Sequence, residues 1–487
     1  MAIKSPILYE NPSATAFVID IPSSIAQAQA LPGQTPPASQ PHPASSTRGS
    51  YHGERTLLSS APLREPYPTL TEPKTEAARA RVLERLPLAE RQYHSGVIEP
   101  LVVEKLAELK GALENKFEWC LPRSLIENDA PDSPEDPAQG EQIQFLGKKR
   151  KRQRSNTTCS CSCLNPESGS IHSNRSPTRN DPPLILAPGE NTFASISELS
   201  NNLVQNTSIE PATVKIRCQS TSTTEASNNN RTNTITNHYH SFHIPPSSHF
   251  LRCTIPISEP IHKSSSQPLL PGLPYDQKFN LILLDPPWTN RSVRRSGHYQ
   301  TQFYKGWDLL TERICGILRG YLHFASGGGE EGAQLHGNSK GPVAAIWITN
   351  SAKARKTAYE AIRGAGLEVC EEWVWCKVTM DGKPIVEVGG LWRKPYEVLV
   401  IGKVPSSCGD GDGDGGIVRR VIAAVPDVHS RKPNLKELFE RMFFSSGEVG
   451  GCVPYAALEV FARNLTAGWW ACGDDVLKFN SEEWWVD

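Results

Sequence analysis

The stretch LILLDPPW, residues 281–288, decides the fold of the second half of the chain. Its four aliphatic residues are typical of a central strand in a parallel sheet, which is apolar on both faces. The two prolines end the strand, because proline has no backbone N–H for the hydrogen bonds of a sheet. Asp285 is therefore predicted at the carboxyl edge of a sheet, where open α/β folds bind their ligands.

A similar stretch, DPPLIL at residues 181–186, has the opposite order. Its prolines precede the aliphatic residues, a polar tract precedes Asp181, and no aromatic residue follows at once. No strand delivers the Asp181 carboxylate to a sheet edge, so no site is predicted there. The prediction for Asp285 therefore rests on the order of the residues: an apolar strand, then the aspartate, then two prolines, then a tryptophan. The tripeptide Asp-Pro-Pro alone does not predict a site.

Downstream of residue 243, strand-like and helix-like segments alternate. This alternation predicts an α/β fold, a Rossmann-like, doubly wound and mainly parallel sheet over residues 243–487. Strands are expected at 279–285, 343–349, 368–378, 397–402, 416–425 and 455–462, and helices at 307–318, 352–366 and 435–444.

The first half of the chain is different in composition. The chain has 40 prolines and 36 glycines with only 38% hydrophobic residues, and most of its 11 tryptophans lie after residue 285. We expect a mostly disordered region at 1–73 with one strand from Ala16 to Ile21, a helical accessory segment at 74–121, and a low-complexity linker at 122–242.

The charge of the chain and one basic segment bear on its ligands and its location in the cell. The formal net charge of −1 means that any contact with nucleic acid must be local. The basic run KKRKRQR, residues 148–154, resembles a nuclear import signal, and the alternative is an ordinary solvated charge run. We favour an import receptor as partner and the nucleus as location. With no apolar stretch of 18 residues, no membrane contact is expected.

Two motifs that suggest a metal are weak. CSCSC, residues 159–163, offers three alternate thiols without a histidine nearby, so free cysteines are the better interpretation. The loop that begins at Asp410 matches the first half of a calcium-binding EF-hand loop, but Val421 stands where the loop needs a glutamate. No metal site is predicted.

The chemistry of Asp285, the prolines and Trp288 suits a flat base with an exocyclic amine. The amine can donate hydrogen bonds to Asp285 and to a proline carbonyl that lacks another partner, while the base stacks on the indole. Such contacts would direct the nitrogen lone pair at an electrophile. The alternative is a tight turn closed by a tryptophan of the core.

Four blocks of sequence carry a family resemblance: DPPW with the following NRSVRRSGHY, RKPYEVLVIGK (393–403), VHSRKPNLKELF (428–439) and LEVFARNLTAGWWACGDDVLKF (458–479). Together they resemble the MT-A family of adenosine N6-methyltransferases, within it the methyltransferase-like protein 4 branch. The resemblance covers residues 243–487 and implies a permuted sheet, in which the cofactor-binding strand follows the catalytic one.

The resemblance also implies an activity, which is methyl transfer from S-adenosylmethionine to N6 of adenine in nucleic acid. RNA is the expected substrate, specifically small nuclear RNA at a 2′-O-methylated adenosine. DNA adenine is the alternative substrate, because the same pocket would serve it. A third hypothesis is a scaffold that binds nucleic acid without catalysis.

Site residues follow from the same resemblance. The adenine would be held and activated by Asp285, Pro286, Pro287 and Trp288. The loop facing the substrate would contribute Asn290, Arg291, Ser292, Arg294, Arg295 and Tyr299. The cofactor would be surrounded by Lys432, Glu459, Arg463, Asn464, Asp474 and Asp475.

Two positions depart from the family pattern. Thr254 stands where the family has an aspartate that contacts the cofactor, and Asp474 stands where the family more often has asparagine. Threonine can form a hydrogen bond but carries no charge, so both departures bear on cofactor affinity.

Overall fold

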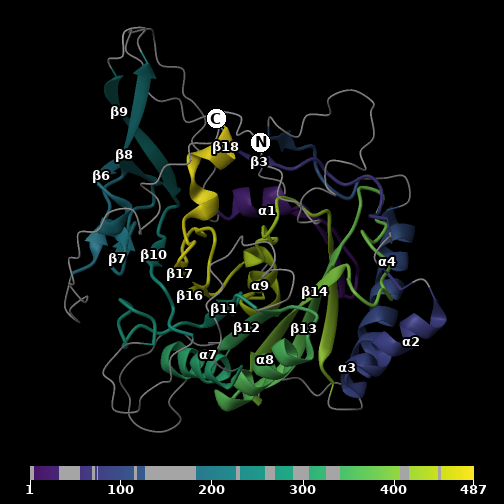
Figure 1. The fold of residues 1–487 in the computed structure, drawn as a ribbon. Coiled ribbons are helices and arrows are strands. Elements are labelled where there is room, and N and C mark those ends of the chain that lie inside the picture. The colour runs from purple at the N-terminus through teal and green to yellow at the C-terminus, as the bar shows by residue number, and fades with distance from the viewer. Residues whose placement is uncertain are drawn as a thin grey trace, which may run out of the picture.

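The structure is a computed structural model, shown in Figure 1. It describes residues 5–31, 55–68, 72–73, 75–113, 118–126, 182–225, 231–257, 269–288, 307–324, 341–405, 416–447 and 451–486. The basic run 148–154, the CSCSC motif, the substrate-loop residues 290–299 and most of the acidic loop after Ser406 lie outside these ranges. No helix in the described ranges is both long and apolar enough to cross a membrane.

A sheet of 12 strands forms the centre of the molecule. In spatial order it contains β1 (Ile7–Glu10), β2 (Ala16–Ile19), β15 (Val418–Ala424), β13 (Glu368–Lys377), β14 (Tyr396–Lys403), β12 (Val343–Ile348), β11 (Leu281–Leu284), β16 (Ala457–Val460), β17 (Trp470–Gly473), β10 (His249–Arg252), β7 (Leu203–Gln205) and β5 (Leu184–Ile185).

The sheet is mainly parallel around the predicted site. Strand β11 pairs in parallel with β12 on one side and β16 on the other, so Leu284 lies opposite both Ile346 and Val460. Strand β14 is reversed and pairs antiparallel with β12 and β13. The predicted α/β class is therefore confirmed, and β11, β12, β13 and β16 all end at one edge.

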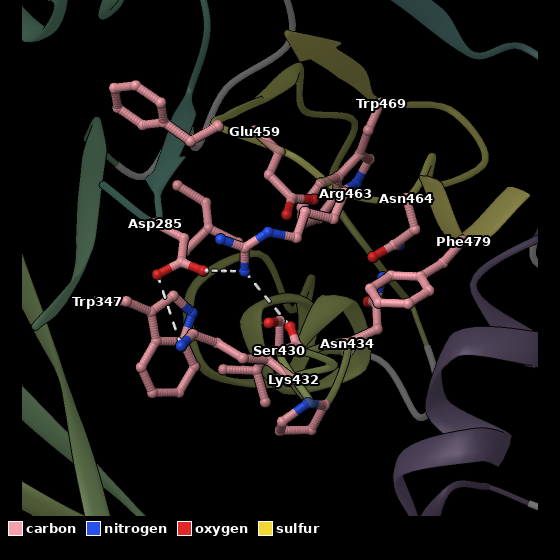
Figure 2. A pocket seen from close by; sticks show the side chains of 14 residues that line it. Asp285, Trp347, Ser430, Lys432, Asn434, Glu459, Arg463, Asn464, Trp469 and Phe479 are labelled. Carbon is pink, nitrogen blue, oxygen red and sulfur yellow. Dashed lines mark hydrogen bonds and ion pairs between the residues drawn. The ribbon is translucent and has the colours of Figure 1, made fainter. Parts of the chain in front are cut away.

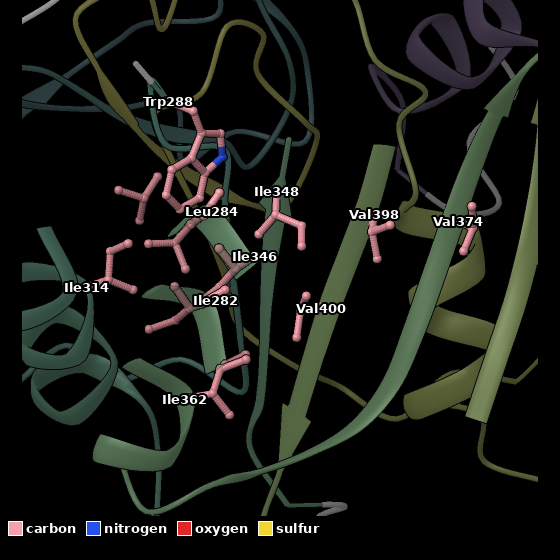
Figure 3. Packing of buried hydrophobic residues seen from close by; sticks show 14 of the residues in the cluster. Ile282, Leu284, Trp288, Ile314, Ile346, Ile348, Ile362, Val374, Val398 and Val400 are labelled. Carbon is pink, nitrogen blue, oxygen red and sulfur yellow. The ribbon is translucent and has the colours of Figure 1, made fainter. Parts of the chain in front are cut away.

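Helices cover both faces of the sheet, as a doubly wound fold requires. Helices α7 (Trp307–Tyr321) and α8 (Ala352–Gly364) cover the face of Ile282 and Leu284, and Figure 3 shows Ile314 and Ile362 packed there. Helix α9 (Lys436–Phe443) packs against the opposite face. The apolar run of β11 thus meets a helical layer on each side.

The accessory segment is helical, as predicted. It forms α2 (Glu76–Glu84), α3 (Leu88–Tyr93), a π-helix (His94–Ile98) and α4 (Glu99–Leu113). Helix α4 packs against β2 and β15 and contributes to the hydrophobic core. Its buried residues are Val102, Leu106, Leu109 and Leu113. The segment therefore packs against the main domain rather than forming a separate module.

Two smaller sheets complete the fold. One joins β3 (Thr56–Ser59), β4 (Ser124–Leu125) and β18 (Trp485–Val486), close to helix α1 (Ile21–Gln27). The other joins β6 (Gly189–Phe193) to a long hairpin of β8 (Ala212–Glu225) and β9 (Arg231–Ile244), which projects from the body in Figure 1. Short 3-10 helices lie at Ile196–Leu199, Lys478–Asn480 and Glu482–Trp484.

The predicted domain boundary at residue 243 needs correction. Strands β1 and β2 come from the region 1–73, and β5 and β7 come from the predicted linker 122–242, yet all four belong to the main sheet. The predicted strand at Ala16 is confirmed, and it pairs in parallel with β15. These strands are only two to four residues long, and β2 reaches its partner β15 across about 400 residues of sequence. The many Thr, Ser and Asn residues of the β8–β9 hairpin made that segment resemble low-complexity sequence.

Candidate active site

A pocket opens at the carboxyl edge of β11, β12 and β16 (Figure 2). Its lining combines charged, polar and aromatic side chains from four segments that are distant in the sequence. The lining residues are Leu283, Asp285, Trp347, Ser430, Lys432, Pro433, Asn434, Leu435, Glu459, Phe461, Arg463, Asn464, Trp469 and Phe479. Five of the residues predicted from the sequence, Asp285, Lys432, Glu459, Arg463 and Asn464, are thus brought together.

Asp285 projects into this pocket from the end of β11. Its backbone N–H donates to the carbonyl of Val460 at 3.2 Å, which fixes the residue to the neighbouring strand β16. The carboxylate lies between two cations: Nζ of Lys432 is 3.5 Å from Oδ1, and Nη1 of Arg463 is 3.2 Å from Oδ2. The Arg463 Nη1 also donates to the carbonyl of Ser430 at 3.4 Å. The Asp285 side chain is therefore held in one orientation.

Lys432 is shared between Asp285 and a second carboxylate, Glu397. Its Nζ donates to Oε2 of Glu397 at 2.6 Å, and Nζ of Lys377 donates to the other oxygen at 2.7 Å. Burial alone would lower the pKa of Lys432, but Asp285 and Glu397 outweigh it and leave the pKa raised. Burial would likewise raise the pKa of Glu397, but Lys377 and Lys432 hold it well below the usual range. Lys377, Glu397, Lys432 and Asp285 thus form a row of alternating charge. Each group favours the charged form of its neighbours.

Trp347 forms one wall of the pocket. The Lys432 ammonium lies 5.2 Å from its ring centroid, a cation–π contact that further fixes the lysine. Sequence reasoning missed both Trp347 and Glu397 as parts of the site. Glu397 lay within the RKPYEVLVIGK block, where a glutamate beside the buried Tyr396 on an otherwise apolar strand was a detectable signal.

Two lining residues have polar atoms without partners. Nδ2 of Asn464 is buried and makes no hydrogen bond with any described residue. The carboxyl group of Glu459 likewise makes no hydrogen bond within the described ranges. Burial, together with the charge of Asp285, raises the pKa of Glu459 to about 8, although Arg463 opposes the shift. Such groups are normally satisfied by a ligand or water.

These unpaired groups fit S-adenosylmethionine. A buried amide can donate to a ribose hydroxyl, and a carboxyl group can accept from a hydroxyl or an amine. Lys432 and Arg463 can meet a carboxylate. The donor set of the pocket therefore matches the polar parts of this cofactor, with Asn464 and Glu459 as the residues that would hold it.

Trp288 differs from the prediction. Its side chain is only 6% exposed and packs in the core beside Leu284, with its indole Nε1 donating to the carbonyl of Trp347 at 2.7 Å (Figure 3). One ring face is occupied by Trp307, at 5.9 Å between centroids. Trp288 does not line the pocket, so the alternative of a turn closed by a core tryptophan describes it better.

The prolines also behave differently. The carbonyl of Pro286 is not free, because it accepts a 2.8 Å hydrogen bond from the backbone N–H of Trp288. The same turn buries Pro286 and leaves Pro287 half-buried. The local sequence could not reveal this bond, since it depends on how tightly the chain folds back after the second proline.

Asp474 and Asp475 lie at the same edge of the sheet but outside the pocket lining. Both are exposed beyond the end of β17, and Thr254 follows the adjacent strand β10. The Thr254 hydroxyl donates to Oδ1 of Asp474 at 2.6 Å, so the two departures from the family pattern contact each other. Although Asp474 is partly exposed, partial desolvation of its carboxyl group outweighs this bond and raises its pKa.

Comparison with known proteins finds one matching family model and several relatives. Residues 336–475 match MT-A70, a range that begins after Asp285. A relative from Cryphonectria parasitica, named N6-methyladenosine RNA methyltransferase MTA1, is 39% identical over 43% of this chain and 55% of its own length. The human N(6)-adenine-specific methyltransferase METTL4 is 28% identical over 62% of this chain and 59% of its own.

A further relative, named DNA N6-methyl methyltransferase, comes from Caenorhabditis elegans and is 27% identical over 43% of this chain and 48% of its own length. The chain thus spans about half to three fifths of the relatives it matches. The names of these relatives cover both RNA and DNA. The expected resemblance to the MT-A70 family and its methyltransferase-like protein 4 branch is confirmed.

Proposed function

We propose that this chain, whose residues 336–475 match MT-A70, methylates N6 of adenine in nucleic acid, using S-adenosylmethionine. The observation that carries the proposal is the Asp285 carboxylate, held by Lys432 and Arg463 at the carboxyl edge of the central strand. When bound, the cofactor supplies an electrophilic methyl group on a positively charged sulfur.

In this proposal the residues of the chain bind and orient the base. Asp285 accepts hydrogen bonds from the exocyclic amine of adenine, which turns the nitrogen lone pair out of conjugation with the ring. Lys432 and Arg463 keep the carboxylate in place, so little reorganisation is needed during the reaction. The leaving amine proton passes to Asp285 or to water.

We favour RNA as the substrate and the nucleus as the location. The similarity to the Cryphonectria parasitica protein named as an RNA methyltransferase supports RNA, and the basic run 148–154 supports nuclear import through its receptor. Within RNA, a 2′-O-methylated adenosine of small nuclear RNA is the target suggested by the branch. DNA remains the alternative, supported by the relative from Caenorhabditis elegans.

A transfer assay tests these proposals together. The full chain is incubated with methyl-labelled S-adenosylmethionine and three oligonucleotides of one sequence: RNA, RNA with a 2′-O-methylated target adenosine, and DNA. We expect transfer to N6, strongest for the 2′-O-methylated RNA, and at least ~100-fold slower transfer by Asp285→Ala. Asp276→Ala, at an exposed site, is the matched control.

Three outcomes would contradict parts of the proposal. Transfer that survives in Asp285→Ala would refute the site. Preferred transfer to DNA would refute the substrate class. Binding of oligonucleotide and cofactor without transfer would support the hypothesis of a scaffold without catalysis.

A further inference from the structure

The connection between β13 and β14, residues 378–395, is held by residues from the first hundred of the chain. The backbone N–H of Met380 donates to the carbonyl of Leu63 at 2.9 Å, and the N–H of Tyr67 donates to the carbonyl of Ile385 at 2.8 Å. The Lys394 side chain pairs with Glu99, the first residue of α4. Residues far apart in the sequence therefore brace this loop along its length.

The tightest support is at the tip. The carboxylate of Glu72 accepts from the backbone N–H of Leu391 at 3.0 Å and from that of Trp392 at 3.1 Å. The turn itself requires glycine at position 390, because a Cβ there would lie only 2.7 Å from the carbonyl oxygen of Arg393. The backbone at Trp392 is thus fixed from both sides.

This fixed backbone presents a tryptophan to solvent. Trp392 is 56% exposed, and it is the only large hydrophobic residue of the loop that is exposed. Within the described ranges, no aromatic ring or cation contacts its indole. Arg393, also exposed, and Lys394 follow it directly. A single exposed ring on a held backbone, next to Arg393, suits stacking on a base better than docking of a protein, which needs a contiguous apolar patch.

The loop lies at the edge of the sheet that carries the pocket. Strands β12 and β13 both pair antiparallel with β14, so β13 ends at the same edge as β11 and β12. The strands on either side of the loop also contact the site, because Lys377 of β13 bonds to Glu397 of β14, and Glu397 bonds to Lys432. Trp392 lies five residues before Glu397, and therefore within about 18 Å of it along the chain, at the edge of the sheet that carries the pocket.

We propose that Trp392 stacks on an unpaired base next to the target adenine, and that Glu72 is the positioning residue for this ring. The proposal rests on the proposed function, because it takes single-stranded nucleic acid as the ligand. Because the backbone of Trp392 is already held, binding has to order only the side-chain rotamer, which lowers the entropic cost of stacking. Stacking of this kind changes affinity by about 5- to 150-fold per base.

Binding is measured first, without catalysis. Fluorescence anisotropy of a labelled single-stranded RNA containing one adenine gives Kd for the full chain and its variants. We expect Trp392→Ala to raise Kd by about 5- to 150-fold and Trp392→Phe to raise it far less. Phe324→Ala is the control, because Phe324 is an exposed aromatic residue just after α7, near the opposite edge of the sheet.

Abasic oligonucleotides identify the stacked base. An abasic site is placed at each position flanking the adenine in turn. If the base at one of these positions stacks on Trp392, removing that base should weaken binding of the wild-type chain as much as Trp392→Ala weakens binding of the intact oligonucleotide. The same abasic site should not weaken binding of Trp392→Ala any further. Glu72→Ala should weaken binding in the same direction and add little to Trp392→Ala, while thermal unfolding shows that each variant is folded.

Two results would overturn the inference. A Kd of Trp392→Ala within twofold of wild type on every oligonucleotide would exclude stacking. A change of oligomeric mass in Trp392→Ala, measured by light scattering, would assign the ring to a protein interface instead. Wild-type chain that binds RNA through Trp392 but transfers no methyl group would refute the proposed function and leave this inference standing.

Discussion

The guanidinium of Arg463 donates a 3.2 Å hydrogen bond to Oδ2 of Asp285, although the two residues are separated by 178 positions. The bond joins the end of β11 to the segment that follows β16, and it fixes the carboxylate that we assign to the adenine amine. Arg463 thereby has two roles: it orients the Asp285 carboxylate for the reaction, and it lines the pocket.

Arg463→Gln should lower kcat by about 10- to 100-fold, because the released carboxylate no longer has one orientation. The pair is partly solvated, with side chains 18% and 16% exposed, so the free energy of unfolding should fall by no more than about 1 kcal/mol. Steady-state kinetics and urea unfolding measure the two effects, with Arg319→Gln on the exposed side of α7 as control. A large loss of stability with unchanged kcat would contradict this assignment.

Glu397→Gln should change the pH profile of the reaction. Glu397 helps to keep the pKa of Lys432 raised, so its removal lowers that pKa and moves the alkaline limb of the kcat profile to lower pH. The lowered pKa of Glu397 itself means that its stabilising effect is present above pH ~4.5 and lost as the pH falls further. We expect the variant to be about 1–3 kcal/mol less stable at pH 7. An alkaline limb at the wild-type position would refute the coupling.

Glu459→Gln should remove a pH dependence of stability. The folded protein raises the pKa of Glu459 from 4.5 to about 8, so between these values the folded state binds a proton that the unfolded state does not. Stability from this group therefore falls as the pH rises from about 4.5 to 8, by at most ~1.4 kcal/mol per pH unit. Thermal unfolding across this range should show a shallower slope in Glu459→Gln, whereas the exposed control Glu483→Gln should keep the wild-type slope.

Trp288→Phe separates a core residue from a stacking residue. Phenylalanine retains most of the apolar volume but leaves the carbonyl of Trp347 without its 2.7 Å donor, so a loss of about 1–3 kcal/mol is expected. Trp288→Ala should cost about 3–5 kcal/mol, as for other large cavities in cores. Denaturant unfolding checks both values. If Trp288→Ala kept full stability and only raised KM for nucleic acid, the indole would face the substrate after all.

Asp427→Asn tests a buried pair beside the site. Asp427 and Arg431 both have side chains that are 0% exposed, and Nη1 of Arg431 lies 2.7 Å from Oδ2. Removing the charge leaves the guanidinium buried without a counter-ion, so a loss of about 3–5 kcal/mol is expected from denaturant unfolding. Asp276→Asn, at an exposed carboxylate, should change stability by less than ~0.5 kcal/mol.

The strand β11 and the helices around it were predictable because their signals are local. Four consecutive aliphatic residues, two prolines and the 3.6-residue period of α7 need no information from elsewhere in the chain. The same holds for the position of Asp285 at a sheet edge. The place of β2 in the main sheet was harder to predict, because its partner β15 lies about 400 residues further along the chain.

Within the site, the residue types were predictable but their contacts were not. Asp285, Lys432, Glu459 and Arg463 were chosen from motifs, and they meet in one pocket. The direction of the Trp288 ring and the pairing of Glu397 with Lys432 depend on packing between elements. A sequence pattern indicates which side chains lie at the carboxyl edge of the sheet. The rotamers of these side chains depend on the residues that pack around them in the folded structure.

The pairing of Leu57 in β3 with Trp485 in β18 has a consequence for biosynthesis. At ~5–20 residues per second, a ribosome needs roughly 20 to 90 s to make the intervening chain, and β2 must wait almost as long for β15. During that time the apolar side chains of Phe17 and Ile19 lack their final neighbours. We therefore expect the nascent chain to depend on chaperones, and to fold slowly after its last strand has left the ribosome.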